Sequence, residues 1–325
     1  MSIPEDFPER TCRHLTQAEK INSGYIGRMR FHQSWFRYAV LGLQPGPNPH
    51  AAGKLYGNML KTEDGAEGKN FLAAEIYEVA KQRFPPDRQI DDNGRLYNNL
   101  LGSQTMAFNL FGPLKRKPVA TELFRKLPGF PENVTVTDVD FEYPLPSENP
   151  MNDHTAFDVF VRYERAGGSK GFVGIETKLT EPFSKQPYPF DRYAHWKEAG
   201  GWWWREGADE EFEKASYNQL WRNHLLAFAM LHQKTPNFDE GYIAVVHPLA
   251  DKECVDAIAE YRRVLLPEGE RTMLHWPLET IVGAWEEALR DDDELHKWIE
   301  LFQLRYLQLE ASEEAWRRFR GDNHG

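Results

Sequence analysis

Two short segments joined by a glycine-rich turn constrain the fold of this chain more than any other feature. The segments are "TAFDVFVRYE", residues 155–164, and "GFVGIETKL", residues 171–179, and the turn between them is "RAGGSKG". Both segments alternate between apolar and polar residues and are rich in β-branched and aromatic side chains. Alternation with a period of two is typical of β-strands, so the pattern predicts an antiparallel hairpin.

The neighbouring segments extend the hairpin into a mixed core. "VTVTDVDFEY", residues 134–143, predicts a strand before the hairpin, and "GRLYNNLLGSQTMAFNLFGPL" predicts a buried helix before that strand. "SYNQLWRNHLLAFAMLHQ" predicts a helix after the hairpin, followed by a short buried strand, "GYIAVVHP". The order of helix, three strands, helix and strand predicts an α/β (α+β) fold with a three-stranded antiparallel meander.

We expect three regions along the chain. Residues 1–94 form an N-terminal helical region with a glycine-punctuated loop at 44–70, and residues 251–325 form a C-terminal helical region. The core occupies residues 95–250, with an insertion near 183–215.

The composition predicts a cytoplasmic protein without a membrane anchor. The chain has 325 residues, of which 41% are hydrophobic and 27% are charged, and no apolar run reaches the roughly 18 residues that span a bilayer. Its N-terminus lacks a basic and then apolar signal segment. Cys12 and Cys254 are too few for a disulfide framework.

The formal net charge of −11 argues against binding nucleic acid through the overall field of the protein. Any such contact must come from a local basic patch, or from metal ions that offset carboxylates of the site. The candidate patches are Lys115, Arg116 and Lys117, with Arg125 and Lys126 close behind.

Three charged side chains share one face of the predicted hairpin. A turn centred on Gly167 places Asp158 opposite Glu176, and a turn centred one residue later places Asp158 opposite Lys178. In either register, opposed Cβ atoms lie roughly 5 Å apart. Two adjacent carboxylates repel each other and raise one pKa unless a cation lies between them.

Two kinds of cation fit this pattern. Lys178 alone would form a structural ion pair on a solvated face of the sheet. Alternatively, Mg²⁺ binds the two carboxylates, since this ion takes oxygen ligands and keeps several waters. The lysine could then orient or deprotonate a water for attack on a phosphodiester. Gly171 and Gly174 would leave room for the substrate backbone.

The hairpin and its flanking segments resemble the PD-(D/E)XK nuclease superfamily. Asp158, followed by Glu176-Thr177-Lys178 at the end of the next strand, is similar to the motif of that superfamily. Within it, a bacterial family of restriction-endonuclease-like proteins resembles "SQTMAFNLFGPL", "TAFDVFVRY", "GIETKLTEPF" and "QLWRNHLLAFAML". The resemblance covers about half the chain, and Phe157 stands where the superfamily has a proline.

The resemblance implies a Mg²⁺-dependent DNA endonuclease, with Mn²⁺ as an alternative ion and with a role in restriction or defence. Asp158 and Glu176 would bind the metal, and Lys178 would lie beside the attacking water. The candidate substrate-binding residues are Gln104, Gln219 and Arg222. Because double-strand cutters of this type often work as dimers, a homodimer is an alternative to a monomer.

Each further candidate also has a structural interpretation. Gln104 is equally well explained as a buried amide bonded to backbone. Glu142 is either an additional ligand or a solvated charge at a strand end. Gln219, Arg222 and His224 lie on the helix after the hairpin. Gln219 and Arg222 are i, i+3 neighbours that could share a face, and are otherwise ordinary helix-surface residues.

Two other features are weaker pointers. "GGSKG", residues 167–171, matches a serine-hydrolase motif, but a strand follows it where that motif requires a helix. Trp202-Trp203-Trp204 could stack on unpaired bases, although a buried cluster is the more frequent outcome. The rival function is a catalytically silent module of the same fold that binds nucleic acid or a protein partner. The intact Asp, Glu and Lys set favours the nuclease, and the acidic charge favours the rival.

Overall fold

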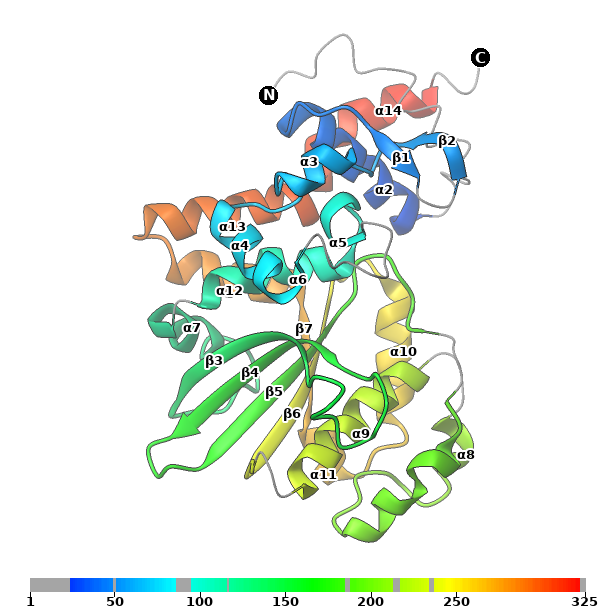
Figure 1. Ribbon diagram of the computed structural model, residues 1–325, viewed down its shortest axis with the longest axis vertical. Coiled ribbons are helices and arrows are strands. Elements are labelled where there is room, and N and C mark those ends of the chain that lie inside the picture. Colours follow the sequence, from blue (N-terminus) through cyan, green and yellow to red (C-terminus); the bar gives the residue numbers. More distant parts are fainter. Residues whose placement is uncertain are drawn as a thin grey trace. The chain divides into compact units, whose positions relative to one another are not determined.

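The alternating segments of the sequence form one five-stranded sheet in the computed structural model (Figure 1). The strands, in spatial order, are β3 (Val134–Tyr143), β4 (Phe157–Arg165), β5 (Lys170–Thr177), β6 (Glu240–His247) and β7 (Met273–Pro277). The first three are antiparallel neighbours, whereas β5, β6 and β7 run parallel. The meander with a parallel extension confirms the mixed α/β class.

The structure describes residues 24–48, 51–85, 95–115, 117–184, 188–212, 217–233 and 237–321. The chain divides into two compact units, of which the first holds Met1–Pro113 and Leu289–Gly325 and the second holds Leu114–Ala288. The sheet belongs to the second unit. The region boundaries expected from the sequence, near residues 94 and 250, stay a prediction.

The register of the β4–β5 hairpin selects one of the two predicted alignments. Val159 pairs with Ile175 and Phe160 pairs with Gly174, so the turn is centred on Gly167. The pairing ends at Val159 and Ile175, and the alternation of β4 breaks just before it: Phe157, predicted to share a face with Val159, packs against Phe160 and Phe172 on the other face.

Helices cover both faces of this sheet (Figure 1). On one face, α9 (Asn218–His232) and α10 (Lys252–Arg262) pack on a core that includes Phe160, Phe172 and Val245. On the other face lie α7 (Lys117–Phe124) and α12 (Leu278–Ala288), where the ring of Phe124 contacts those of Trp276 and Trp285. Burial on both faces explains why β5 and β6 are almost continuously apolar.

The remaining elements of the second unit are shorter. They are the 3₁₀ segment Phe190–Ala199, α8 (Asp209–Phe212) and α11 (Pro267–Arg271). Trp203 and Trp204, within the expected insertion, are buried against Phe228 of α9. The tryptophan cluster is therefore part of the core.

The first unit is helical around a small hairpin. Its helices are α2 (Tyr25–Trp35), continued by a π-helical turn (Phe36–Val40), α3 (Thr62–Ala66), α4 (Ala74–Arg83), α5 (Arg95–Asn98), α6 (Ser103–Phe111), α13 (Asp293–Tyr306) and α14 (Glu313–Gly321). Two 3₁₀ segments, Gly112–Lys115 and Leu309–Ser312, complete the helical elements described, and the hairpin pairs β1 (Gly46–Asn48) with β2 (Ala51–Tyr56). The buried guanidinium of Arg305 binds the carbonyl and side-chain oxygens of Asn70, both at 2.6 Å.

Two local expectations were wrong. The segment 44–70 contains the β1–β2 hairpin and α3 as well as loops, and the helix expected over 94–114 is interrupted between α5 and α6. The C-terminal region is mostly helical, as expected, but it also contributes the edge strand β7, which was not predicted. β7 is only five residues long and lies between helices, so its sequence lacks the alternation that would reveal a strand.

None of the helices in the described part of the chain has the length and apolar character that a membrane span requires.

Two glycines of β5 leave no room for a substrate, contrary to expectation. A Cβ at Gly174 would lie 2.5 Å from the ring of Phe157, and a Cβ at Gly171 would lie 2.4 Å from the ring of Tyr163. Both rings are buried, so the glycines accommodate neighbouring side chains. Phe157 thus fills the space above β5 immediately before Asp158.

Gly174→Ala is expected to lower the free energy of unfolding by about 1–3 kcal/mol, because the new methyl group overlaps a ring that cannot move away. The matched control is Gly167→Ala in the turn of the same hairpin, where nothing lies within 4 Å of the added Cβ. That variant should be neutral or stabilising by up to about 1 kcal/mol. Urea denaturation measures both, and equal stabilities would contradict the proposed packing.

Candidate functional site

The carboxylate of Asp158 joins the start of β4 to the end of β5. The paired residues of the hairpin end at Val159 and Ile175. Beyond that pair, Asp158 Oδ2 accepts hydrogen bonds from the backbone N–H of Thr177 at 2.6 Å and from its Oγ1 at 2.7 Å. No described residue donates a hydrogen bond to Oδ1. The side chain therefore replaces a link of the strand ladder and keeps one oxygen available.

Glu176 is held from both of its oxygens. Oε1 lies 2.7 Å from the Nζ of Lys178 and accepts a hydrogen bond from Gln219 Nε2 at 2.7 Å. Oε2 accepts a hydrogen bond from Asn223 Nδ2 at 2.6 Å. The Glu176 and Lys178 side chains are only 6% and 8% exposed. The ion pair that the sequence allowed is present, but it is buried rather than on a solvated face.

Gln219 connects this pair to the loop that follows β5. Its Oε1 accepts from Lys178 Nζ at 3.1 Å and from the backbone N–H of Ser184 at 2.8 Å, while its Nε2 donates to Glu176. The amide therefore uses each end for a different partner, which fixes its orientation. One side chain of α9 thus positions Glu176 and Lys178 together.

The cluster brings the carboxyl groups of Asp158 and Glu176 next to one lysine, Lys178. Burial, together with the neighbouring carboxylates of Glu176 and Glu142, raises the pKa of Asp158 well above its usual value, against the opposing effects of Lys178 and the Thr177 N–H. Burial alone would lower the pKa of Lys178, but attraction to Glu176 and Asp158 outweighs it and raises that pKa. Lys178 is therefore a cation at neutral pH.

This charge pattern fits a divalent cation. Mg²⁺ is held in proteins by one or two carboxylates while it keeps several waters. Asp158 Oδ1 accepts no hydrogen bond from a described residue, and Glu176 is paired with Lys178. Among the described residues, no three His, Cys, Asp or Glu side chains are already gathered as metal ligands. Asp158 and Glu176 are the two carboxylates of this cluster that could hold a metal.

The helix α9 also carries the other predicted residues. Arg222 donates from Nη1 to Thr155 Oγ1 at 2.8 Å, just before β4. His224 lies in the core instead, where its ring nitrogens lie 2.8 Å from Tyr261 Oη and Thr272 Oγ1. Burial lowers the pKa of His224 to about 3, so its ring is neutral and structural.

Gln104 lies on α6, in the first compact unit, whereas the sheet belongs to the second. Its role in substrate binding stays a prediction. Cys254 is buried as a free thiol, and Cys12 lies outside the described residues.

Sequence reasoning missed Asn223 and Thr177. Asn223 follows Gln219 by four residues, so both amides extend from one face of α9 toward Glu176. That spacing was a usable signal. Thr177 gave no signal, because the alternation of β5 assigns its side chain to the opposite face. Its hydrogen bonds to Asp158 depend on the ending of the strand pairing, which only the fold reveals.

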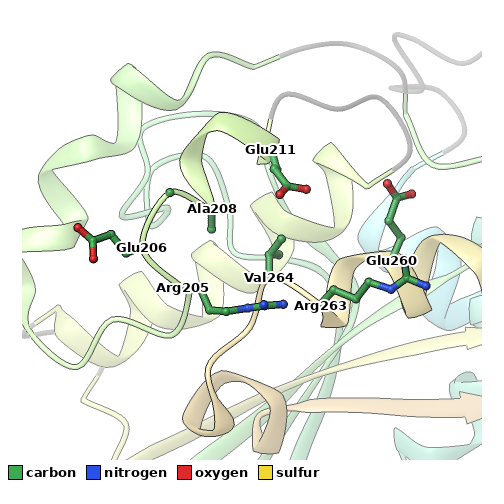
Figure 2. Close-up of a pocket in the computed structure, with 8 residues that line it drawn as sticks. Arg205, Glu206, Ala208, Glu211, Glu260, Arg263 and Val264 are labelled. Atoms are coloured by element: carbon green, nitrogen blue, oxygen red, sulfur yellow. The ribbon is translucent and has the colours of Figure 1, made fainter.

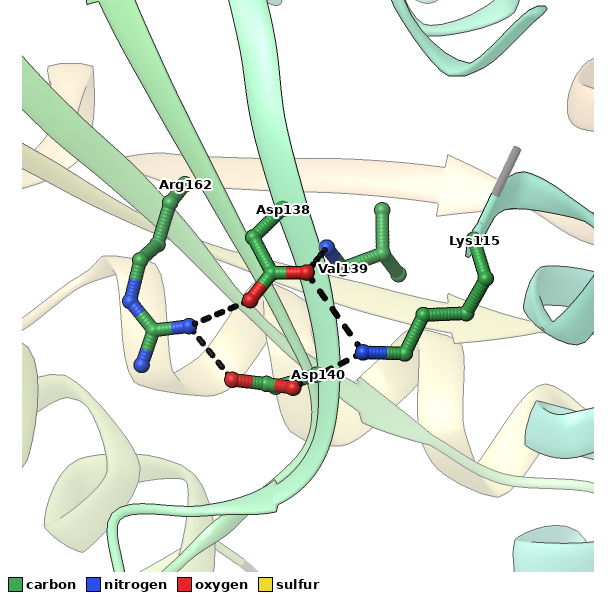
Figure 3. A network of polar contacts seen from close by, with 5 residues as sticks. All are labelled: Lys115, Asp138, Val139, Asp140 and Arg162. Atoms are coloured by element: carbon green, nitrogen blue, oxygen red, sulfur yellow. Dashed lines mark hydrogen bonds and ion pairs between the residues drawn. The ribbon is translucent and has the colours of Figure 1, made fainter. Parts of the chain in front are cut away.

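Two residues of the candidate basic patches, Lys115 and Arg125, form contacts within the protein. Lys115 lies 3.4 Å from Asp138 and 2.9 Å from Asp140, and Arg162 binds the same two carboxylates (Figure 3). Arg125 binds the carbonyl of Val134. Arg116 lies outside the described residues, and the side chain of Lys117 is not described.

A separate cavity of about 390 Å³ lies at α8 and α10 (Figure 2). Its charged lining residues are Arg205, Glu206, Glu211, Glu260 and Arg263. None of the predicted site residues lines it, and its charges of both signs indicate no particular ligand.

Comparison with known proteins identifies one family. The model of the PD-(D/E)XK nuclease superfamily matches residues 21–308, which is most of the chain. No curated protein and no solved structure matches this chain.

Asp158→Asn is expected to raise the free energy of unfolding of the metal-free protein at neutral pH by about 0.5–2 kcal/mol. It replaces a carboxyl group whose charged form is disfavoured by burial and by Glu176 and Glu142, while the Asn Oδ1 can still accept from Thr177. Because the folded-state pKa of Asp158 is raised, its charge is destabilising above the unfolded-state pKa of about 3.9. The gain should therefore shrink as the pH falls toward that value, as urea denaturation across pH would measure.

Asp140→Asn is the matched control with the opposite sign. Arg162 and Lys115 hold the pKa of Asp140 below its usual value although burial opposes them, so its charge is stabilising. Removing it should lower stability by up to about 1 kcal/mol, as for a partly exposed ion pair. A similar loss in Asp158→Asn would contradict the raised pKa of Asp158.

Proposed function

This chain belongs to the PD-(D/E)XK nuclease superfamily, and we propose that it is a Mg²⁺-dependent endonuclease that hydrolyses phosphodiester bonds of DNA. One observation carries the proposal: Asp158 bonds to the end of β5 where Glu176 and Lys178 form a buried pair. Asp158 and the Glu-x-Lys segment thus lie together where β4 begins and β5 ends.

In this proposal Asp158 and Glu176 hold the metal. Asp158 has an oxygen free of protein hydrogen bonds, and Glu176 is kept in place by the amides of Gln219 and Asn223. When bound, Mg²⁺ or Mn²⁺ supplies Lewis acidity for the phosphoryl oxygens and lowers the pKa of a bound water.

Lys178 acts through its ammonium group. Because its pKa is raised in the metal-free protein, Nζ is a hydrogen-bond donor and cannot take a proton in that state. We assign it the role of orienting the attacking water and of stabilising negative charge on the phosphate. Gln219, expected from the sequence to bind substrate, is in this proposal a positioning residue, because both ends of its amide already have partners within the protein.

The rival function, a catalytically silent module that binds nucleic acid or a protein partner, is favoured by one observation. The net charge is −11, and Lys115 and Arg125 of the candidate basic patches are engaged in intramolecular contacts. Binding of DNA without cutting, in the presence of Mg²⁺ or Mn²⁺, would support that function. A homodimer, a cytoplasmic location and a role in restriction or defence stay predictions.

The purified protein should cut plasmid and linear DNA with Mg²⁺ or Mn²⁺ and lose this activity in chelator. Lys178→Ala should abolish cutting, because it removes the cation beside the metal-binding carboxylates. Its matched control is Lys170→Ala, at the exposed start of the same strand, which should cut normally. Circular dichroism should verify that both variants are folded, and undiminished cutting by Lys178→Ala would refute the assignment of Lys178.

Asp158→Asn should also weaken Mg²⁺ binding by roughly tenfold or more, because a neutral amide oxygen replaces a charged ligand. Isothermal titration calorimetry with Mg²⁺ alone measures this effect, with Asp140→Asn as the control that keeps wild-type affinity. Unchanged affinity in Asp158→Asn would remove Asp158 from the metal site.

A further inference from the structure

Arg222 is a nearly buried cation that forms no ion pair with a described carboxylate. It is 8% exposed and lies on α9 between Gln219 and Asn223, which both bind Glu176. Nη1 donates to Thr155, whereas Nε is fully buried without a hydrogen-bond partner. Nη2 also makes no hydrogen bond with a described residue and, unlike Nε, is not fully buried. A buried N–H without an acceptor is destabilising, so this arrangement needs a cause.

The guanidinium is fixed in place from two sides. Its Cζ lies 3.8 Å from the centre of the Tyr188 ring. Thr155 Oγ1, which accepts from Arg222, donates in turn to Asp153 Oδ2 at 2.9 Å, and Tyr193 Oη donates to the same oxygen at 2.6 Å. The carboxylate of Asp153 is thus linked to the guanidinium through the hydroxyl of Thr155.

The contacts of α9 tie Arg222 and its neighbour Asn223 to the two strand ends that carry the proposed metal-binding residues. Thr155 precedes Asp158 by three residues, so the Arg222 bond ties α9 to the start of β4. The Asn223 bond ties the same turn of α9 to Glu176, at the end of β5. These two strand ends are the ones that Asp158 joins.

We propose that Arg222 binds a backbone phosphate of the nucleic-acid substrate next to the bond that is cut, an inference that rests on the proposed function. The two nitrogens without partners, Nε and Nη2, lie on one side of the planar guanidinium, and such a pair matches two phosphate oxygens. A phosphate oxygen would bind Nη2, which is not fully buried and lies on the same side of the guanidinium as Nε. This contact would add a local attraction for a polyanion to a chain whose net charge of −11 opposes one.

The test is binding of a fluorescein-labelled DNA oligonucleotide, single-stranded and duplex, measured by anisotropy at several salt concentrations. Ca²⁺ replaces Mg²⁺ so that the DNA is not cut. Arg222→Gln should weaken binding roughly tenfold and reduce the slope of log K against log salt by about one, because one phosphate contact is lost. Arg162→Gln is the matched control and should change neither quantity, since Arg162 is paired with Asp138 and Asp140.

Two further variants keep the test decisive if Arg222→Gln does not fold. Arg222→Lys keeps the charge and loses the paired donors, so it should bind more weakly with an unchanged salt slope. Thr155→Val leaves Arg222 intact and removes the hydroxyl that accepts a hydrogen bond from its Nη1. This variant should also bind DNA more weakly with an unchanged salt slope. Wild-type affinity in both variants would overturn the inference.

The outcomes also separate this inference from the proposed function. If the wild type cuts DNA and Arg222→Gln binds it with wild-type affinity and salt slope, Arg222 is not a phosphate contact and the nuclease assignment stands. If the wild type neither binds nor cuts DNA, both proposals fail.

Discussion

The register of the β4–β5 hairpin determines where the charged groups of the site lie. A slip by one residue would turn every side chain of one strand to the opposite face and separate Asp158 from Glu176. The buried rings of Phe157 and Tyr163 oppose such a slip, because each occupies space above β5 that only a glycine leaves open. The packing that stabilises the hairpin therefore also aligns its carboxylates.

Two side chains of the helix α9 donate hydrogen bonds to the buried carboxylate of Glu176. A buried carboxylate beside a second one is unfavourable unless donors surround it, and the amides of Gln219 and Asn223 supply two such donors for Glu176. At Asp158, by contrast, burial and the neighbouring carboxylates still disfavour the charged form. Groups that form a binding site commonly lower the stability of the fold in this way. Stability and metal affinity are thus expected to respond in opposite directions to changes at this carboxylate.

Much of this arrangement could be predicted from the sequence, because it depends on local patterns. Alternation revealed β3, β4 and β5, and the spacing of Asp158, Glu176 and Lys178 followed from it. The edge strand β7 escaped prediction because it is short and lacks alternation. The bond from Thr177 to Asp158 escaped it because hydrogen bonds across a strand end depend on where pairing stops, which side-chain periodicity does not encode.

The division of the chain has a consequence for how it is made. The sheet unit, Leu114–Ala288, is continuous in sequence, whereas the first unit is built from both ends of the chain. Arg305 of α13 binds Asn70, and Arg28 of α2 binds Ser312, so the first unit is closed only by residues that follow the sheet unit in the sequence. During translation the sheet unit can fold while the N-terminal helices still await their partners. Loss of α13 and α14 would therefore open the first unit before it disturbed the β4–β5 hairpin.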